Sequence, residues 1–219
     1  MRLALVPLWL AAFVPAAAPA ATPAAVAAAV DLGRCVAKAD RSAALDLMRT
    51  LPLGDEPVDP AALALGRGGA CATGVTGPVS AILVRGGVAD DMFARDFVEF
   101  GVQPRRVIAD LARIDLPTAL GPGGEGASAD VRALYLVAEC VARSSPTRAE
   151  QLMKTAPGSS GEMRVMEALT PLMQACHRTA APIAFGRGAM RAAITQAAYH
   201  VSARYWAGEM TLAGQAQGR

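Results

Sequence analysis

The sequence predicts an all-α fold made of two tandem copies of a disulfide-stapled helical unit, packed as one body. Its four cysteines form two pairs with equal internal spacing, 105 positions apart: Cys35 with Cys71, and Cys140 with Cys176. The segment 35–52 matches 140–157 without gaps, with eight identities in eighteen positions. Helix start signals and periodic apolar residues recur along the chain, whereas alternating strand patterns are scarce. These observations favour an internal duplication of a helical unit.

Residues 1–20 are predicted to form a signal peptide. They contain one basic residue, Arg2, then an apolar run from Leu3 to Val14, then small residues ending in a cleavage motif at Ala20. An uncleaved membrane anchor is the alternative, although the run is short for a bilayer span. A lipoprotein is disfavoured because the first cysteine, Cys35, lies far from the run.

The first helical repeat is expected over residues 21–117. Thr22 followed by Pro23 predicts a helix start, and that helix is expected to continue through Lys38. Asp40 is expected to cap a short second helix. Two further amphipathic stretches are predicted, one around Phe93 and Phe97 and one from Gln103 to Pro117.

A Gly/Pro-rich linker over residues 118–128 joins the copies, and the second repeat is expected over residues 129–212. Ser145 with Pro146 should start its second helix, while Pro171 should break or kink its third. One long helix is then predicted from Ala189 to about Met210. Its expected buried face consists of Met190, Ile194, Ala197, Val201 and Tyr205. Residues 213–219 are expected to form a flexible tail.

Four cysteines in an exported chain predict two disulfides, and three connectivities are possible. If the two copies fold alike, the pairs are Cys35–Cys71 and Cys140–Cys176, each joining the first helix of its copy to the third. The alternative is free buried thiols in a protein that is not exported. No Cys-x-x-Cys motif is present, so the sequence predicts neither a redox pair nor a zinc knuckle.

The charge pattern gives no sign of a nucleic-acid partner. The formal net charge is only +2, it includes Arg2 of the signal peptide, and the charges are spread along the chain. Two basic pairs recur at equivalent positions of the copies and are interpreted as solvated edges: Lys38 with Arg143, and Arg49 with Lys154. No later run is apolar enough to cross a membrane, and no motif for a cofactor is expected to function.

The densest mixture of aromatic and polar residues lies near the C-terminus, where the candidate binding surface consists of Tyr199, His200, Arg204 and Trp206. The alternative is that these aromatics close the core. His177 beside Cys176 is expected to favour a helix C-terminus. With only two histidines, no metal site is predicted. Met163, Met166 and Met173 are interpreted as core filling in preference to a copper site.

These observations support two hypotheses of different classes. The first is a periplasmic or secreted, non-enzymatic protein that binds another envelope protein or supports the envelope. It depends on the export signal, the disulfides and the lack of a catalytic motif. The second is a small-ligand carrier or an enzyme with its site at the C-terminal Tyr/His/Arg/Trp cluster. The sequence does not define an oligomeric state.

Overall fold

A computed structural model describes residues 22–49, 57–58, 71, 79–97, 127–177 and 185–217. Within these residues the fold is all-α, as predicted, apart from one short antiparallel pair of strands. The predicted signal peptide, nearly all of the predicted linker and the expected helix at Gln103–Pro117 lie outside them. None of the helices described is long and apolar enough to cross a membrane.

In the N-terminal half, the described residues form three helices and the strand pair. They are α1 (Pro23–Ala39), α2 (Arg41–Arg49), β1 (Pro57–Val58), β2 (Val79–Ser80) and α4 (Ala81–Phe97). Thr22 accepts a hydrogen bond from the amide of Ala25, and Asp40 accepts one from the amide of Ala43, so both predicted caps are confirmed. Helix α4 begins at Ala81, within an apolar run that precedes the predicted amphipathic stretch around Phe93 and Phe97.

Four helices are described in the C-terminal half: α7 (Ala129–Ser144), α8 (Pro146–Met153), α9 (Ser160–Cys176) and α10 (Arg187–Gln217). Pro146 occupies the first turn of α8, but the Ser145 side chain makes no capping hydrogen bond. Helix α9 continues through Pro171 instead of ending there. The hydroxyl of Thr170 donates to the carbonyl of Met166 at 3.0 Å. The carbonyl that loses its amide partner to the proline is that of Glu167, one residue further along.

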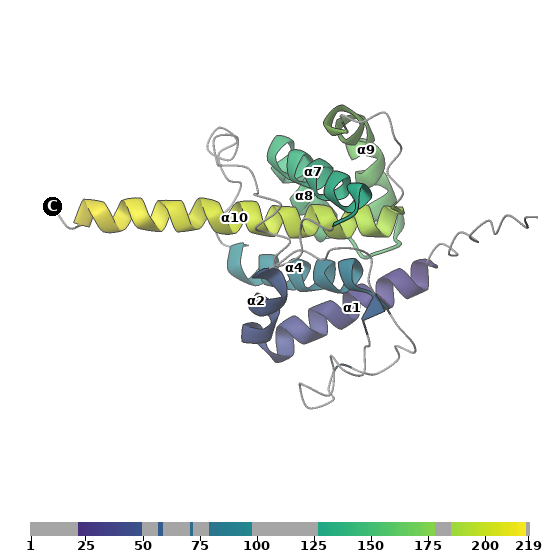
Figure 1. The fold of residues 1–219 in the computed structure, drawn as a ribbon, viewed down its shortest axis with the longest axis horizontal. Coiled ribbons are helices and arrows are strands. Elements are labelled where there is room, and N and C mark those ends of the chain that lie inside the picture. Colours follow the sequence, from purple (N-terminus) through teal and green to yellow (C-terminus); the bar gives the residue numbers. More distant parts are fainter. Residues whose placement is uncertain are drawn as a thin grey trace, which may run out of the picture.

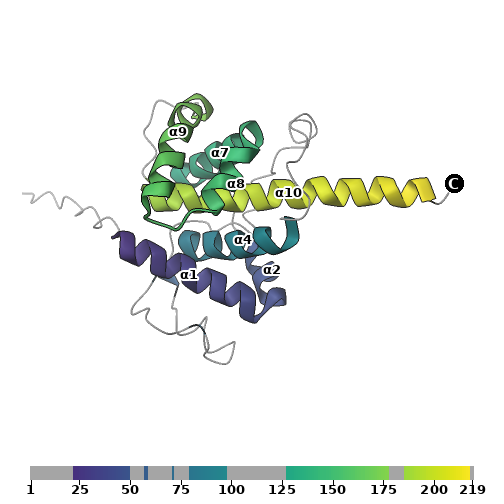
Figure 2. The same cartoon turned by 180° about the vertical axis from the view of Figure 1, so that it is seen from behind.

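Helix α10 lies between two layers of helices (Figure 1, and from behind in Figure 2). Helices α1, α2 and α4 lie on one side of it, and α7, α8 and α9 lie on the other. The face predicted to be buried is confirmed, since each of its five residues is at most 9% exposed. The helix also continues to Gln217, beyond the predicted start of a flexible tail at residue 213.

Close contacts between α1 and α4 depend on two glycines. A Cβ atom placed on Gly33 would collide with the carbonyl of Val84, and one placed on Gly87 would collide with the carbonyl of Val30. The two backbones therefore cross at a distance that no larger residue allows. This crossing explains why Gly87 is tolerated inside α4, where glycine costs about 1 kcal/mol of helix propensity.

The two disulfides have the pairing that the sequence predicted. Cys35 is joined to Cys71 and Cys140 to Cys176, each over a separation of 36 residues, so no cysteine is free. The second bond joins α7 to the end of α9. Such bonds are typical of proteins that fold in an oxidising compartment.

Candidate functional site

The predicted surface at the C-terminal end begins with a tyrosine that is part of the core. Tyr199 is 7% exposed, and its ring lies 5.6 Å from that of Phe97 on α4. Its hydroxyl donates to a carboxylate oxygen of Asp96 at 3.3 Å, and Arg41 binds the same carboxylate at 2.7 and 3.0 Å. Burial raises the pKa of Tyr199 to about 12. This side chain therefore connects α4 to α10.

Of the other three residues of the predicted surface, the structure describes the side chains of His200 and Arg204. Burial, with a smaller contribution from the charges of Arg204 and Arg85, lowers the pKa of His200 to about 4. Its ring is therefore neutral at pH 7, and it lies 6.0 Å from that of Tyr199. Arg204 is exposed, and the Trp206 side chain lies outside the described part. A binding site at these residues stays a prediction.

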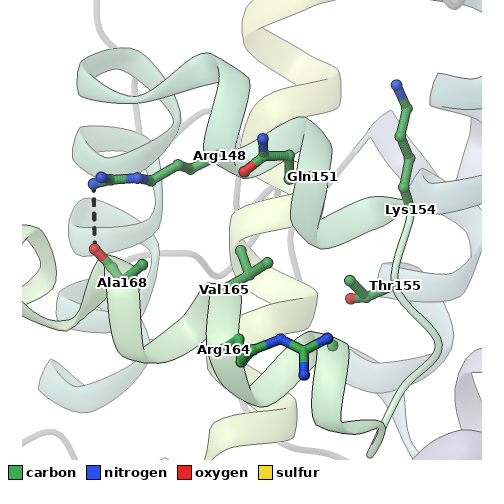
Figure 3. A pocket seen from close by; sticks show the side chains of 8 residues that line it. Arg148, Gln151, Lys154, Thr155, Arg164, Val165 and Ala168 are labelled. Atoms are coloured by element: carbon green, nitrogen blue, oxygen red, sulfur yellow. Dashed lines mark hydrogen bonds between the residues drawn. The ribbon is translucent and has the colours of Figure 1, made fainter.

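A different group of residues forms a groove between α8 and α9, with a volume of about 400 Å³. Three of its eight lining residues are basic, and none is acidic. We call it the basic groove, and its lining consists of Arg148, Gln151, Lys154, Thr155, Gly161, Arg164, Val165 and Ala168 (Figure 3).

The three cations of the basic groove differ in their partners. Arg148 donates to the carbonyl of Ala168 at 3.2 Å, and Lys154 pairs with Glu150 at 2.6 Å. Arg164 forms no hydrogen bond or ion pair with any residue that the structure describes. Figure 3 shows the three charged groups well apart around the groove, with Val165 between them. The groove therefore offers spread positive charge beside a small apolar surface.

A second hollow, of about 260 Å³, lies between α9 and the start of α10. We call it the methionine hollow because half of its lining residues are methionines. The lining consists of Met163, Met166, Glu167, Thr170, Met173, Phe185, Arg187 and Met190.

A buried ion pair lies deeper, where α10 contacts α4 and α8. Arg191, which is 0% exposed, donates to Asp90 at 2.9 Å and to the carbonyls of Leu152 and Thr155 at 3.4 and 3.2 Å. Arg34, whose side chain is 27% exposed, binds the same oxygen of Asp90 at 2.9 Å. The pair is incompletely satisfied: the other Asp90 oxygen, together with Nε and Nη1 of Arg191, has no partner among the described residues.

The comparisons with known proteins do not assign the chain to a group. No protein-family model matches it, and neither a curated protein nor a solved structure is significantly similar. Within the described residues, no cluster of three or more His, Cys, Asp or Glu side chains could hold a metal ion. The basic groove and the methionine hollow are therefore the features of the described residues that bear on function.

Sequence reasoning did not find either groove. It interpreted Lys154 as part of a solvated edge, which agrees with its 66% exposed side chain, but it did not consider Arg148 or Arg164. The available signal was three cations within seventeen residues, on or next to the two consecutive helices α8 and α9. How α8 and α9 cross determines whether those cations share a groove, and periodicity alone does not give that crossing.

Proposed function

We propose that this is an exported, non-enzymatic protein of the bacterial envelope, and that its basic groove binds an acidic segment of another envelope protein. The N-terminal signal pattern and the two disulfides support export to an oxidising compartment. N-terminal sequencing of the natural protein tests export directly, and we expect the mature chain to begin after Ala20.

The basic groove is the observation on which the proposal depends. Arg164 has no acidic partner among the described residues, and no carboxylate lines the groove. A ligand with negative charge would give this guanidinium the partner that the described residues do not supply. The apolar surface of Val165 and Ala168 would contact the uncharged parts of the same ligand.

The spread of the cations favours an extended ligand over a small anion. A site for phosphate normally brings several donors to one point, whereas here Arg148, Lys154 and Arg164 stand apart around an open groove (Figure 3). Carboxylates along a peptide match such spacing. Because exposed ion pairs contribute about 0.2–1 kcal/mol each, we expect weak, salt-dependent binding.

A peptide-binding assay tests the proposal. The probe is a fluorescent twelve-residue peptide in which glutamates alternate with apolar residues, and the control peptide carries glutamine at each glutamate. We expect only the acidic peptide to bind, and Arg164→Gln to weaken it up to about 5-fold. Lys38→Gln is the matched control variant, because Lys38 is an exposed cation at the end of α1, outside the groove.

Three outcomes would contradict the peptide proposal. The first is equal binding of the acidic and glutamine peptides. The second is an equal loss of affinity in Arg164→Gln and Lys38→Gln, which would indicate a general charge effect. The third is displacement of the peptide by millimolar inorganic phosphate with one-to-one saturation, because that result would indicate a carrier for small anions.

We also propose that the two halves are tandem copies. Equal disulfide separations support this, and so do the matching positions of α1 with α7 and of α2 with α8. Contacts between α4 and α10 give further support. Arg191 binds Asp90, while the hydroxyl of Thr195 donates to the carbonyl of Gly86 at 3.4 Å. With the offset of 105 residues, Gly86 corresponds to Arg191 and Asp90 corresponds to Thr195. The Arg191–Asp90 contact and the Thr195–Gly86 contact therefore join equivalent pairs of positions, with the two copies exchanged. If an experimental structure showed that the two halves superpose only when their helices are matched in a different order along the chain, that result would contradict the proposal.

A further inference from the structure

We propose that Arg191 is a positioning residue for the basic groove and ties the groove to α4. The guanidinium donates to the carbonyls of Leu152 and Thr155, at and just beyond the end of α8, and to Asp90 on α4. Lys154 and Thr155, which directly follow α8, line the groove (Figure 3). Arg191 therefore holds one wall of the groove from the core of the protein. This inference rests on the function proposed for the groove and names a residue that controls it.

Arg191 acts on the groove without touching a ligand. Its side chain is 0% exposed, and it is not one of the eight residues that line the groove. Thr155 transmits the effect because it has contacts on both sides. Its carbonyl accepts from Arg191 at 3.2 Å, while its methyl group lies 3.5 Å from the position that a Cβ atom on Gly161 of α9 would occupy. A shift of Thr155 would therefore change the spacing between α8 and α9 in the groove.

The turn between α8 and α9 is fixed at its two ends by different bonds. At the α9 end, the Ser159 hydroxyl accepts from the amide of Glu162, and the Glu162 carboxylate accepts from the amide of Gly158. The carbonyls in the last turn of a helix have no partner within the helix. At the α8 end, Arg191 donates to one of them, that of Leu152, at 3.4 Å, where the helix dipole also favours a cation. Arg191 therefore anchors this end of the turn to α10.

The chemistry of the buried pair favours positioning over simple stabilisation. Nε and Nη1 of Arg191 and one oxygen of Asp90 have no partner among the described residues, so the pair retains part of its desolvation cost. Apolar side chains of similar volume often replace such a pair with equal or greater stability. A guanidinium instead supplies directional hydrogen bonds to two carbonyls, which an apolar side chain cannot make. Those bonds determine where the wall of the groove lies.

Binding of the acidic twelve-residue peptide tests the inference with two variants and a control. We expect Arg191→Met to weaken binding about 3-fold, because a displaced wall weakens the exposed ion pair between Lys154 and the peptide. Asp90→Ala/Arg191→Met should weaken binding equally. This double variant leaves no unpaired charge buried, so it keeps the test valid if the single variant does not fold. It also removes one charge of each sign, so its loss of affinity is not an effect of net charge.

Arg34→Met is the matched control. Arg34 also binds Asp90 at 2.9 Å, but its ion pairs are with residues of α1 and α4 and not with the end of α8. The variant should therefore bind the peptide as the natural protein does. An equal loss of affinity in Arg34→Met and Arg191→Met would overturn the positioning role, and so would a double variant that binds like the natural protein.

Nuclear magnetic resonance of the free protein gives a readout that a general loss of stability would not change. The nuclear Overhauser effect between the Thr155 methyl group and the α-protons of Gly161 should weaken in both Arg191 variants and persist in Arg34→Met. An unchanged effect would overturn the inference. If the natural protein does not bind the acidic peptide, the function proposed for the groove fails and this inference with it. If the natural protein binds and Arg191→Met binds equally well, only this inference fails.

Discussion

Replacing Arg191 by methionine tests how the two sides of α10 are held together. The substitution preserves most of the side-chain volume and removes the guanidinium that bonds Asp90, Leu152 and Thr155. Asp90 would remain 5% exposed, with Arg34 as its remaining ion-pair partner among the described residues. The variant therefore leaves a buried carboxylate with half of its counter-charge.

The expected loss is about 3 kcal/mol in the free energy of unfolding. Removing one member of a buried pair costs about 3–5 kcal/mol, and Arg34 should keep the loss near the lower limit. Arg34→Met is the matched control, because Arg34 bonds the same Asp90 oxygen at the same 2.9 Å but is 27% exposed. Its partly solvated pair should contribute about 1 kcal/mol or less.

Urea unfolding at pH 7, followed by circular dichroism with the disulfides intact, measures both losses. The double variant Asp90→Ala/Arg191→Met should be more stable than the sum of its single variants predicts, by about 1–3 kcal/mol, because no unpaired charge is left buried. Equal losses in Arg34→Met and Arg191→Met would refute the importance of burial. Strict additivity in the double variant would refute the pairing itself.

Acid should reduce the defect of Arg191→Met. Burial already raises the pKa of Asp90, and the charges of Arg191 and Arg34 oppose that rise. Without Arg191 the folded state should bind a proton on Asp90 more readily than the unfolded chain does. A group with a raised folded pKa adds stability at low pH and loses it as pH increases. The defect should therefore be smaller at pH 4.5 than at pH 7, and a larger defect at pH 4.5 would contradict this reasoning.

Three further predictions concern other parts of the fold. Burial lowers the pKa of His200 from 6.5 to about 4, so the free energy of unfolding should fall by about 3 kcal/mol as the pH is lowered between those values. In urea titrations, His200→Gln should remove this pH dependence. Replacing Cys140 and Cys176 by serine should cost about 4 kcal/mol, from the entropy of a 36-residue loop; an unchanged denaturation midpoint would contradict it. Gly87→Ala should cost at least about 2 kcal/mol by forcing α4 from α1, whereas Gly186→Ala, where a Cβ meets open space, should be nearly neutral in thermal unfolding.

The sequence was informative where a local or repeated signal determines the structure. Thr22 with Pro23 predicted the start of α1, and the equal cysteine spacing selected the observed disulfides. The sequence did not predict that α4 begins at Ala81, because an apolar run with two adjacent glycines gives no clear helix signal there. Glycine lowers helix propensity, and only the close crossing with α1 compensates for that loss.

The polar core of α10 could not be predicted because its partners are distant in sequence. Arg191, Thr195 and Gln196 are each at most 1% exposed, although a predicted one-sided helix would place them in water. Their hydrogen bonds to Asp90, Gly86 and Ile82 span 101, 109 and 114 residues. The periodicity of apolar residues indicates which residues share a face of the helix. It does not indicate that other helices pack against both faces of α10.

The basic groove also bears on when it arose, given the tandem-copy proposal. At positions 105 residues earlier, Lys154 corresponds to the basic Arg49, but Arg148 and Arg164 correspond to Ala43 and Asp59. A feature needed only for the shared fold should occur in both copies, as the disulfides and the short second helices do. Two of the three cations have no basic equivalent in the first copy. The full set of cations is therefore best explained as a property of the second copy alone, and under this proposal an acidic partner would engage only the side of the molecule that α8 and α9 form.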